Sequence, residues 1–266
     1  MTHKSGLFWF GGKARPELHK WIISLLPDSY DLYVEPYAGM LGVLLNRNKA
    51  AIEIVNDLNG NVVNWWRVIR DKKDEFKEQL LWTPNSEELF YEYYDSLSEG
   101  TDVERAIKLT VVQIHSRMSS DNRRAFGNRM AKGASKNYNY ILEQLDELRK
   151  RTRNVIIRKT DALSLLKKMV NRDYAVTYCD PPYKTADTSL YSVDVQQDLT
   201  GVLLEQKGKV AISGYNDEWD HLGWFRHTKE IPYANGMLNE KQPMRTEVLW
   251  TNYKGGSQLT LGDNNE

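Results

Sequence analysis

The segment "DLYVEPYAGMLGVLLN" (residues 31–46) decides the fold class. Its first five residues predict a short buried strand, and Glu35-Pro36 ends that strand. The small residues Ala38-Gly39 then form a turn, and "MLGVLLN" at 40–46 predicts a helix. A strand, a glycine turn and a helix open a nucleotide-binding type of fold, because glycine lets the backbone approach a ligand closely. No Lys-Ser or Lys-Thr pair follows, so the turn is not a phosphate-binding P-loop.

The flanking segments extend this pattern on both sides. Hydrophobic periodicity predicts helices over 15–27, 61–71, 161–169 and 193–206 and strands over 51–56, 154–159, 175–179 and 209–215. Two further stretches, 225–233 and 246–253, predict a strand pair at the C-terminal end. Alternating strands and helices are typical of a parallel sheet with covered faces. The sequence therefore predicts an α/β fold with a Rossmann-like sheet, mostly parallel, with an antiparallel C-terminal strand pair.

A helical, loop-bearing insertion interrupts the alternation. Residues 72–119 read as helical throughout, and Thr101 with Glu104 forms a capping box for one of these helices. Residues 119–137 lack periodicity and predict a long loop, a feature that is often functional. Another helix follows at 140–151. We expect a catalytic domain of residues 1–71 and 152–266 and a target-recognition insertion of residues 72–151.

Charge is unevenly distributed along a chain whose formal net charge is zero. Residues 71–104 hold eleven acidic and three basic residues, whereas residues 117–159 hold twelve basic and four acidic ones. A basic stretch rich in Asn, Gly and Ser is the usual footprint of a contact with a nucleic-acid backbone. An ordinary solvated surface, in which the two blocks pair with each other, explains the charges equally well.

Composition excludes several classes of protein. The chain has no apolar run of membrane-spanning length, and its N-terminal stretch does not resemble a signal peptide, so we expect a cytoplasmic protein without membrane contact. Its single cysteine, Cys179, excludes an internal disulfide. One cysteine and five scattered histidines argue against a zinc site, and we expect no metal.

A second motif, "AVTYCDPPY", follows at residues 175–183. Ala175 to Cys179 predicts a buried strand, and Asp180 stands where that strand ends. Pro181 and Pro182 fix two φ angles and remove two backbone donors. The result is a stiff turn that offers oxygen acceptors and suits a planar group with N–H donors, although a proline-rich turn with a packed Tyr183 is the simpler interpretation.

Two weaker signals accompany these motifs. Asp57 ends the strand at 51–56 and is placed to bind a ribose hydroxyl, or else to cap the helix that follows. "FWFGGKARP" near the start combines a flexible Gly11-Gly12 turn with Lys13 and aromatic residues, and it can equally be an N-terminal arm that packs on the core.

Taken in order, "FGGK", "VEPYAG", "NDLN" and "DPPY" resemble the Dam-like (D12 class) N6-adenine DNA methyltransferases. The resemblance covers nearly the whole chain, is firm in the cofactor and catalytic parts, and implies a methyltransferase sheet and S-adenosylmethionine (SAM) as methyl donor. It also implies the residues that contact the cofactor, which are Trp9, Phe10, Gly11, Lys13, Glu35, Tyr37, Ala38, Gly39, Asp57, Asp161 and Asp180. The catalytic motif it implies consists of Asp180, Pro181, Pro182 and Tyr183.

The same resemblance implies double-stranded DNA as substrate, with the target adenine flipped out of the helix. Candidate DNA contacts are the basic side chains of the insertion, namely Arg117, Arg123, Arg124, Arg129, Lys132 and Lys136. Similar motifs occur in methyltransferases that act on RNA bases, on cytosine N4 and on protein glutamine, and a catalytically degenerate DNA-binding protein is a further alternative. Aspartate at position 180 favours adenine, and the basic insertion favours nucleic acid. Neither the oligomeric state nor pairing with a restriction nuclease follows from the sequence.

One position departs from the pattern of the family. The family usually carries Gly-x-Gly in its glycine turn, whereas Gly39-Met40-Leu41-Gly42 places a leucine where the second glycine is expected. Because this turn is assigned to the cofactor, we expect the leucine to affect the affinity for SAM.

Overall fold

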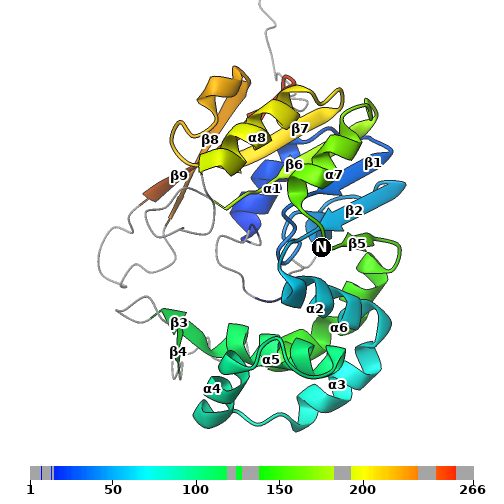
Figure 1. The fold of residues 1–266 in the computed structure, drawn as a ribbon, viewed down its shortest axis with the longest axis vertical. Helices are drawn as coiled ribbons and strands as arrows, with labels where there is room; N and C mark the ends of the chain where they lie inside the picture. Colours follow the sequence, from blue (N-terminus) through cyan, green and yellow to red (C-terminus); the bar gives the residue numbers. More distant parts are fainter. Residues whose placement is uncertain are drawn as a thin grey trace, which may run out of the picture. The chain divides into compact units, whose positions relative to one another are not determined.

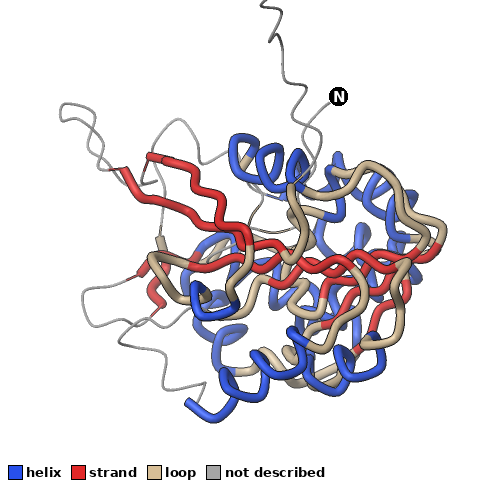
Figure 2. The backbone as a smooth tube through the Cα atoms, turned by 90° about the horizontal axis from the view of Figure 1, so that it is seen from above, coloured by secondary structure: helices blue, strands red, loops and turns tan. Residues whose placement is uncertain are grey.

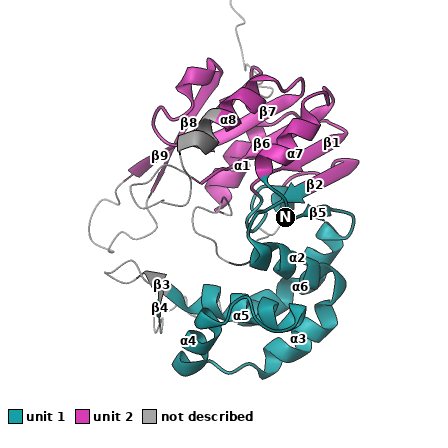
Figure 3. Cartoon of the chain, in the orientation of Figure 1, with its two compact units in different colours: residues 1–14, 38–46, 55–161 teal, residues 15–37, 47–54, 162–266 magenta. Residues whose placement is uncertain are grey.

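The structure is a computed structural model that describes residues 7, 13, 15–118, 124–127, 138–182, 193–232 and 244–255. The chain divides into two compact units (Figure 3). Unit 1 comprises residues 1–14, 38–46 and 55–161, and unit 2 comprises residues 15–37, 47–54 and 162–266. Unit 1 thus contains the predicted insertion together with the glycine turn.

The helices and strands follow one another along the chain as labelled in Figure 1. The α-helices are α1 (Pro16–Leu25), α2 (Gly60–Asp71), α3 (Lys73–Trp82), α4 (Glu87–Asp95), α5 (Asp102–His115), α6 (Tyr138–Thr152), α7 (Ala162–Met169) and α8 (Val193–Leu204). Short 3-10 helices are η1 (Leu44–Asn46) and η2 (Asp220–Leu222). The strands are β1 (Leu32–Glu35), β2 (Ile52–Asn56), β3 (Ser116–Met118), β4 (Arg124–Phe126), β5 (Ile156–Arg158), β6 (Ala175–Cys179), β7 (Lys209–Gly214), β8 (Phe225–Pro232) and β9 (Met244–Thr251).

Seven strands form one sheet in the order β5-β2-β1-β6-β7-β9-β8. Strand β6 pairs in parallel with both β1 and β7, whereas β9 runs antiparallel to β7 and to β8. Figure 2 shows the backbone turned by 90° from Figure 1, with the strands in red. The predicted α/β class and the antiparallel C-terminal strand pair are therefore confirmed.

Apolar side chains on alternate residues of the strands bury one face of the sheet in unit 2. Leu32 and Val34 of β1 and Ala175 of β6 pack with Leu165 and Met169 of α7. Farther along the sheet, Cys179 of β6 and alternate apolar residues of β7 and β9 pack with α7 and α8 in a second cluster. Because side chains alternate along a strand, the residues between these positions must point to the opposite face. That face carries the polar groups described below.

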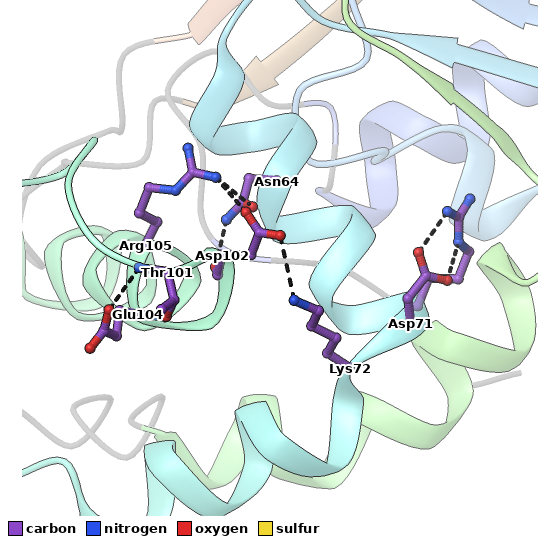
Figure 4. Close-up of polar contacts among 8 residues, drawn as sticks. Asn64, Asp71, Lys72, Thr101, Asp102, Glu104 and Arg105 are labelled. Atoms are coloured by element: carbon purple, nitrogen blue, oxygen red, sulfur yellow. Dashed lines mark hydrogen bonds and ion pairs between the residues drawn. The ribbon is translucent and has the colours of Figure 1, made fainter.

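In unit 1, helix α5 docks on helix α2 through buried aromatic rings and a polar cluster. Trp65 is fully buried, meets Phe76 edge to face and donates from Nε1 to Thr110 Oγ1 at 2.9 Å. Asn64 of α2 donates to the backbone oxygen of Asp102 and accepts from Arg105, as Figure 4 shows.

The start of α5 has the expected cap. The predicted capping box is present, with Thr101 and Glu104 each accepting the other's backbone N–H (Figure 4). Two orphan donors of the first helical turn are thereby satisfied.

Two predicted elements were wrong. Residues 40–46 do not form a helix, because Gly39 (φ 47°) and Leu41 (φ 55°) both adopt left-handed backbone angles that a right-handed helix excludes. Turns and the single 3-10 helix η1 replace it. The helical interpretation of residues 72–119 was also wrong at its end, where β3 pairs with β4 as an antiparallel hairpin. The expected loop over 119–137 contains β4, and the rest of it lies outside the described residues.

Candidate active site

The face opposite α7 and α8 carries a buried carboxylate at the end of β1. Glu35 is 2% exposed, and its Oε1 accepts from the Tyr33 hydroxyl at 2.7 Å. The Tyr33 ring in turn lies under the Arg47 guanidinium, 3.8 Å from its centroid, and Arg47 pairs with Glu53 at 2.8 Å. Burial and the charge of Glu35 raise the pKa of Tyr33 well above its usual value, so the phenol stays neutral and donates. Glu35 is thus an oriented buried acid, as a binding group must be.

The Asp180 motif follows the neighbouring parallel strand directly. Register pairs Val34 of β1 with Thr177 of β6, so both strands end at the same edge of the sheet. Asp180 is half-buried and Pro181 is buried, whereas Pro182 is exposed. Tyr183, the last residue of the predicted motif, lies outside the described residues. Unit 2 therefore brings Glu35 and Asp180 to the ends of adjacent strands.

Cys179, the residue before Asp180, behaves as expected for a small core side chain. It is fully buried in the cluster beneath α7 and α8. Burial, and then the charge of Asp180, raise the pKa of its thiol. A thiol that stays protonated is a poor nucleophile.

Unit 1 carries the glycine turn and Asp57, and hydrogen bonds join them. Gly39 N–H donates to Asp57 Oδ2 at 2.9 Å, and Asn59 N–H donates to Asp57 Oδ1 at 2.8 Å. Burial raises the pKa of Asp57, and the two backbone hydrogen bonds oppose that rise. Helix α2 takes its cap from Asn59, whose side chain accepts from the N–H groups of Asn61 and Val62. The alternative that Asp57 caps this helix is therefore wrong.

Asn56 is a residue of this site that the sequence analysis missed. It is buried at the end of β2, and its backbone oxygen accepts from Ala38 N–H at 2.8 Å. Its side-chain amide both donates to Thr160 O and accepts from Thr160 N–H, each at 2.9 Å. Asn56 thus ties the glycine turn to the segment that carries the exposed Asp161. An asparagine beside the more conspicuous Asp57 gave no signal of this double contact in the sequence.

Of the remaining residues predicted to contact the cofactor, some are described by the structure and others are not. Tyr37 is half-buried and packs against the apolar cluster of unit 2, and Lys13 is buried in unit 1. Trp9, Phe10 and Gly11 lie outside the described residues.

Of the predicted DNA contacts, only Arg117 and Arg124 fall on described backbone. Arg117 pairs with Ala125 and Arg124 with Met118 in the β3–β4 hairpin. The other four, Arg123, Arg129, Lys132 and Lys136, lie outside the described residues. The sequence analysis did not predict this hairpin, and the DNA-contacting role of its arginines stays a prediction.

Aromatic rings anchor this hairpin to the helices. Phe126 of β4 stacks on His115, with ring centroids 5.4 Å apart, and meets Phe90 of α4 at 5.7 Å. His115 Nε2 also lies 3.1 Å from Asn85 Oδ1 and 3.3 Å from the Tyr138 hydroxyl. Burial lowers the pKa of His115, which favours the neutral ring.

An acidic groove of about 940 Å³ lies between α3, α4 and α5. Glu75, Glu78 and Glu92 line it, and none of the motif residues does. The charge of these side chains would repel a nucleic-acid backbone.

Within the described ranges, no group of three or more His, Cys, Asp or Glu side chains could hold a metal ion. No described helix is long and apolar enough to cross a membrane.

The chain was compared with curated proteins, with solved structures and with protein families. No curated protein matches the chain. Similar solved structures include a precorrin 8W decarboxylase from Methanobacterium thermoautotrophicum (13% identity, TM-score 0.39, 89% of this chain and 88% of that one). An rRNA methylase from Streptococcus thermophilus matches with 9% identity and TM-score 0.36 over 87% and 93% of the two chains. A Streptococcus mutans protein solved in complex with SAH matches with 12% identity and TM-score 0.35 over 89% and 98%.

Residues 9–207 match the sequence pattern of one family, and they include the glycine turn, Asp57 and the Asp180 motif. The chain belongs to the D12 class N6 adenine-specific DNA methyltransferases.

Proposed function

We propose that this enzyme transfers a methyl group from SAM to the exocyclic N6 of adenine in duplex DNA, after the target base has turned out of the helix. The observation that carries the proposal is the Asp180-Pro181-Pro182 turn, which leaves β6 beside the Glu35 end of β1. In the same proposal, residues 1–71 and 152–266 form the catalytic domain and residues 72–151 the recognition insertion.

The residues fit SAM by their chemistry. The buried Glu35 carboxylate suits the ammonium group of the methionine part. Asp57 already accepts two backbone N–H groups, but its carboxylate has further lone-pair sites that can accept ribose hydroxyls. Gly39, with positive φ and no side chain, leaves room for close approach of a ligand. When bound, SAM supplies a methyl group on a sulfonium, which is already an activated donor.

Further residues complete the proposed cofactor site. Asp161 is assigned to the adenine of the cofactor, and Tyr37 and Ala38 to the pocket under it. Trp9, Phe10, Gly11 and Lys13 are assigned to the N-terminal side. The link from Asn56 to Thr160 supports the part played by Asp161, because it fixes the adjoining backbone.

The proposed catalytic groups act on the amine of the target base. Adenine N6 is a poor nucleophile because its lone pair is drawn into the ring. Asp180 accepts one N6–H hydrogen bond and the Pro181 carbonyl accepts another, so the amine is held towards tetrahedral geometry and its developing positive charge is stabilised. The prolines keep both acceptors in place. Tyr183 stacks on the base, a contact worth about 1–3 kcal/mol.

The proposed DNA contacts are Arg117, Arg123, Arg124, Arg129, Lys132 and Lys136. Most of them would neutralise phosphates, and one or two arginines would read guanine edges. The anchored β3–β4 hairpin supports this assignment, since its pairing puts the backbone of Arg117 and Arg124 on a fixed element.

Replacing the catalytic acid tests the proposed reaction. Asp180→Ala should lower the rate of methyl transfer to unmethylated genomic DNA by at least about 100-fold, because one of two preorganised charge contacts is lost. SAM affinity, measured by calorimetry, should persist. Asp173→Ala is the matched control, since Asp173 is an exposed acid just before β6.

Three results would overturn the proposal. The first is an Asp180→Ala enzyme as active as the Asp173→Ala control. The second is N4-methylcytosine, rather than N6-methyladenine, as the modified nucleoside found by mass spectrometry. The third is no binding of SAM by the parent enzyme at millimolar concentration, which would favour a degenerate DNA-binding protein.

Salt dependence tests the DNA contacts separately. Changing Arg123 and Arg124 together to alanine should weaken DNA binding and reduce the slope of log affinity against log salt concentration by up to about 2. DNA binding by the parent enzyme that does not respond to salt would contradict the assignment.

A further inference from the structure

A buried pair of hydroxyl groups joins β6 to β7 just before the Asp180 turn. Tyr178 Oη lies 2.8 Å from Ser213 Oγ, and the two residues are 3% and 2% exposed. Tyr178 pairs in register with Ala211, and Cys179 with Ile212, so Ser213 is level with the residue that follows Cys179. That residue is Asp180. The hydroxyl pair therefore bridges the two strands where the catalytic turn begins.

The pair lies on the polar face of the sheet rather than in the apolar core. Cys179 and Ile212 belong to the cluster under α7 and α8, so their neighbours Tyr178 and Ser213 point to the other face. Glu35 of the adjacent strand β1 also lies on that face, since Leu32 and Val34 occupy the opposite one. Tyr178 thus shares a face with Glu35 of the neighbouring strand and comes two residues before Asp180 along the chain.

The direction in which the pKa of Tyr178 is shifted agrees with this position. Burial first, and then the charge of Asp180, raise the pKa of Tyr178 well above its usual value, with smaller contributions from Glu35 and Glu247. Three carboxylates therefore act on one neutral phenol. A single buried hydrogen bond contributes only about 1 kcal/mol to stability, so folding alone gives little reason for hydroxyls at both positions.

We infer that Tyr178 and Ser213 are positioning residues for Asp180. Their hydrogen bond fixes the end of β6 against β7, and so sets the direction in which the Asp180 carboxylate and the Pro181 carbonyl leave the strand. This inference rests on the proposed function, because it assigns Asp180 to the reacting amine. Small displacements of reacting groups reduce rates steeply, by up to roughly 100-fold for 1 Å.

The test compares Tyr→Phe changes at the buried Tyr178 and at the half-buried Tyr253. Tyr178→Phe removes the bridging hydroxyl, and Tyr253→Phe removes a hydroxyl that donates to Leu25 O at 3.1 Å, a residue outside the motifs. At saturating SAM, the single-turnover rate of methyl transfer should fall about 10- to 100-fold in Tyr178→Phe and stay within twofold of the parent in Tyr253→Phe. The dissociation constant of SAM should change less than twofold in both.

Ser213→Ala provides the second measurement. Because it breaks the same hydrogen bond, it should lower the rate similarly, and the double variant should be no slower than the slower single variant. Three outcomes would overturn the inference: a Tyr178→Phe rate equal to that of Tyr253→Phe, a rate loss explained entirely by weaker SAM binding, or additive losses in the double variant. Asp180→Ala measured alongside separates these from failure of the proposed function, which would show as an active Asp180→Ala enzyme.

Discussion

At Leu41 we expect glycine to be less destabilising than alanine, which is the reverse of the usual order of these two substitutions. Its φ of 55° lies in the left-handed region, and its side chain is fully buried. Only glycine adopts this region without cost, and for other residues the left-handed conformation costs roughly 1–2 kcal/mol. Burial of the leucine side chain therefore has to offset backbone strain at the position where the family usually has glycine.

Two substitutions separate these terms. Leu41→Ala removes the buried side chain, at a cost of roughly 2–5 kcal/mol, but retains the strain. Leu41→Gly loses slightly more apolar contact and also removes the strain, while the freer unfolded chain of glycine costs about 0.4–1 kcal/mol. We expect Leu41→Gly to be about 0.5–1 kcal/mol more stable than Leu41→Ala, with both less stable than the parent.

Leu44 is the matched control. It is equally buried, lies three residues along the chain in η1, and is not among the described residues with positive φ. At this position glycine should be about 0.5–1 kcal/mol less stable than alanine. Urea unfolding of the four variants gives the two differences, and a difference of 1 kcal/mol corresponds to a change in Tm of about 2–4 °C for a chain near this size. The reasoning is refuted if glycine is worse than alanine at position 41 by as much as at position 44.

Three more predictions follow from the described contacts. Tyr33→Phe removes the donor to Glu35 and should raise the dissociation constant of SAM roughly 10-fold, because a hydrogen bond to a charged group contributes about 1.5–3 kcal/mol; unchanged affinity in calorimetry would count against Glu35 as a cofactor ligand. The lowered pKa of His115 means that the unfolded chain binds a proton first as pH falls below about 6.5, so the free energy of unfolding should drop between pH 7.5 and 5.5 in the parent and less so in His115→Gln. Equal drops in the two proteins would show that His115 does not contribute. Thr101→Ala breaks the capping box of α5 and should lower the free energy of unfolding, measured by urea denaturation, by about 1 kcal/mol. A loss below about 0.3 kcal/mol would mean that the cap is redundant.

The α/β core could be predicted because its signals are local. Strands β1 and β6 are buried along their whole length; β1 ends at Glu35, and β6 ends at Cys179, directly before Asp180. A buried strand and an amphipathic helix impose their periods on the sequence whatever surrounds them. The capping box at Thr101 is likewise a pattern confined to a few neighbouring residues.

The turn after β1 could not be predicted in the same way. A helix over 40–46 was expected from residue types, yet Leu41 takes a backbone conformation that leucine avoids when unconstrained. Burial of its side chain and the bond from Gly39 N–H to Asp57 accompany that conformation, and both involve residues distant along the chain. The β3–β4 hairpin was missed for a related reason, since strands of three residues carry too little periodicity and the anchor on Phe90 is tertiary.

The sequence by itself determined the class of the fold, the order of its motifs and the identity of Glu35, Asp57 and Asp180, because each of these is written within a few consecutive residues. Only the tertiary structure decided which groups lie beside those acids: the Tyr33 hydroxyl bonds Glu35, the Gly39 amide bonds Asp57, and a Tyr178–Ser213 hydrogen bond lies at the strand end that precedes Asp180. The physical reason is that a buried polar group must find its partner in space: strand pairing brings Ser213 to Tyr178 from 35 residues away, and the turn after β1 meets Asp57 across 18 residues.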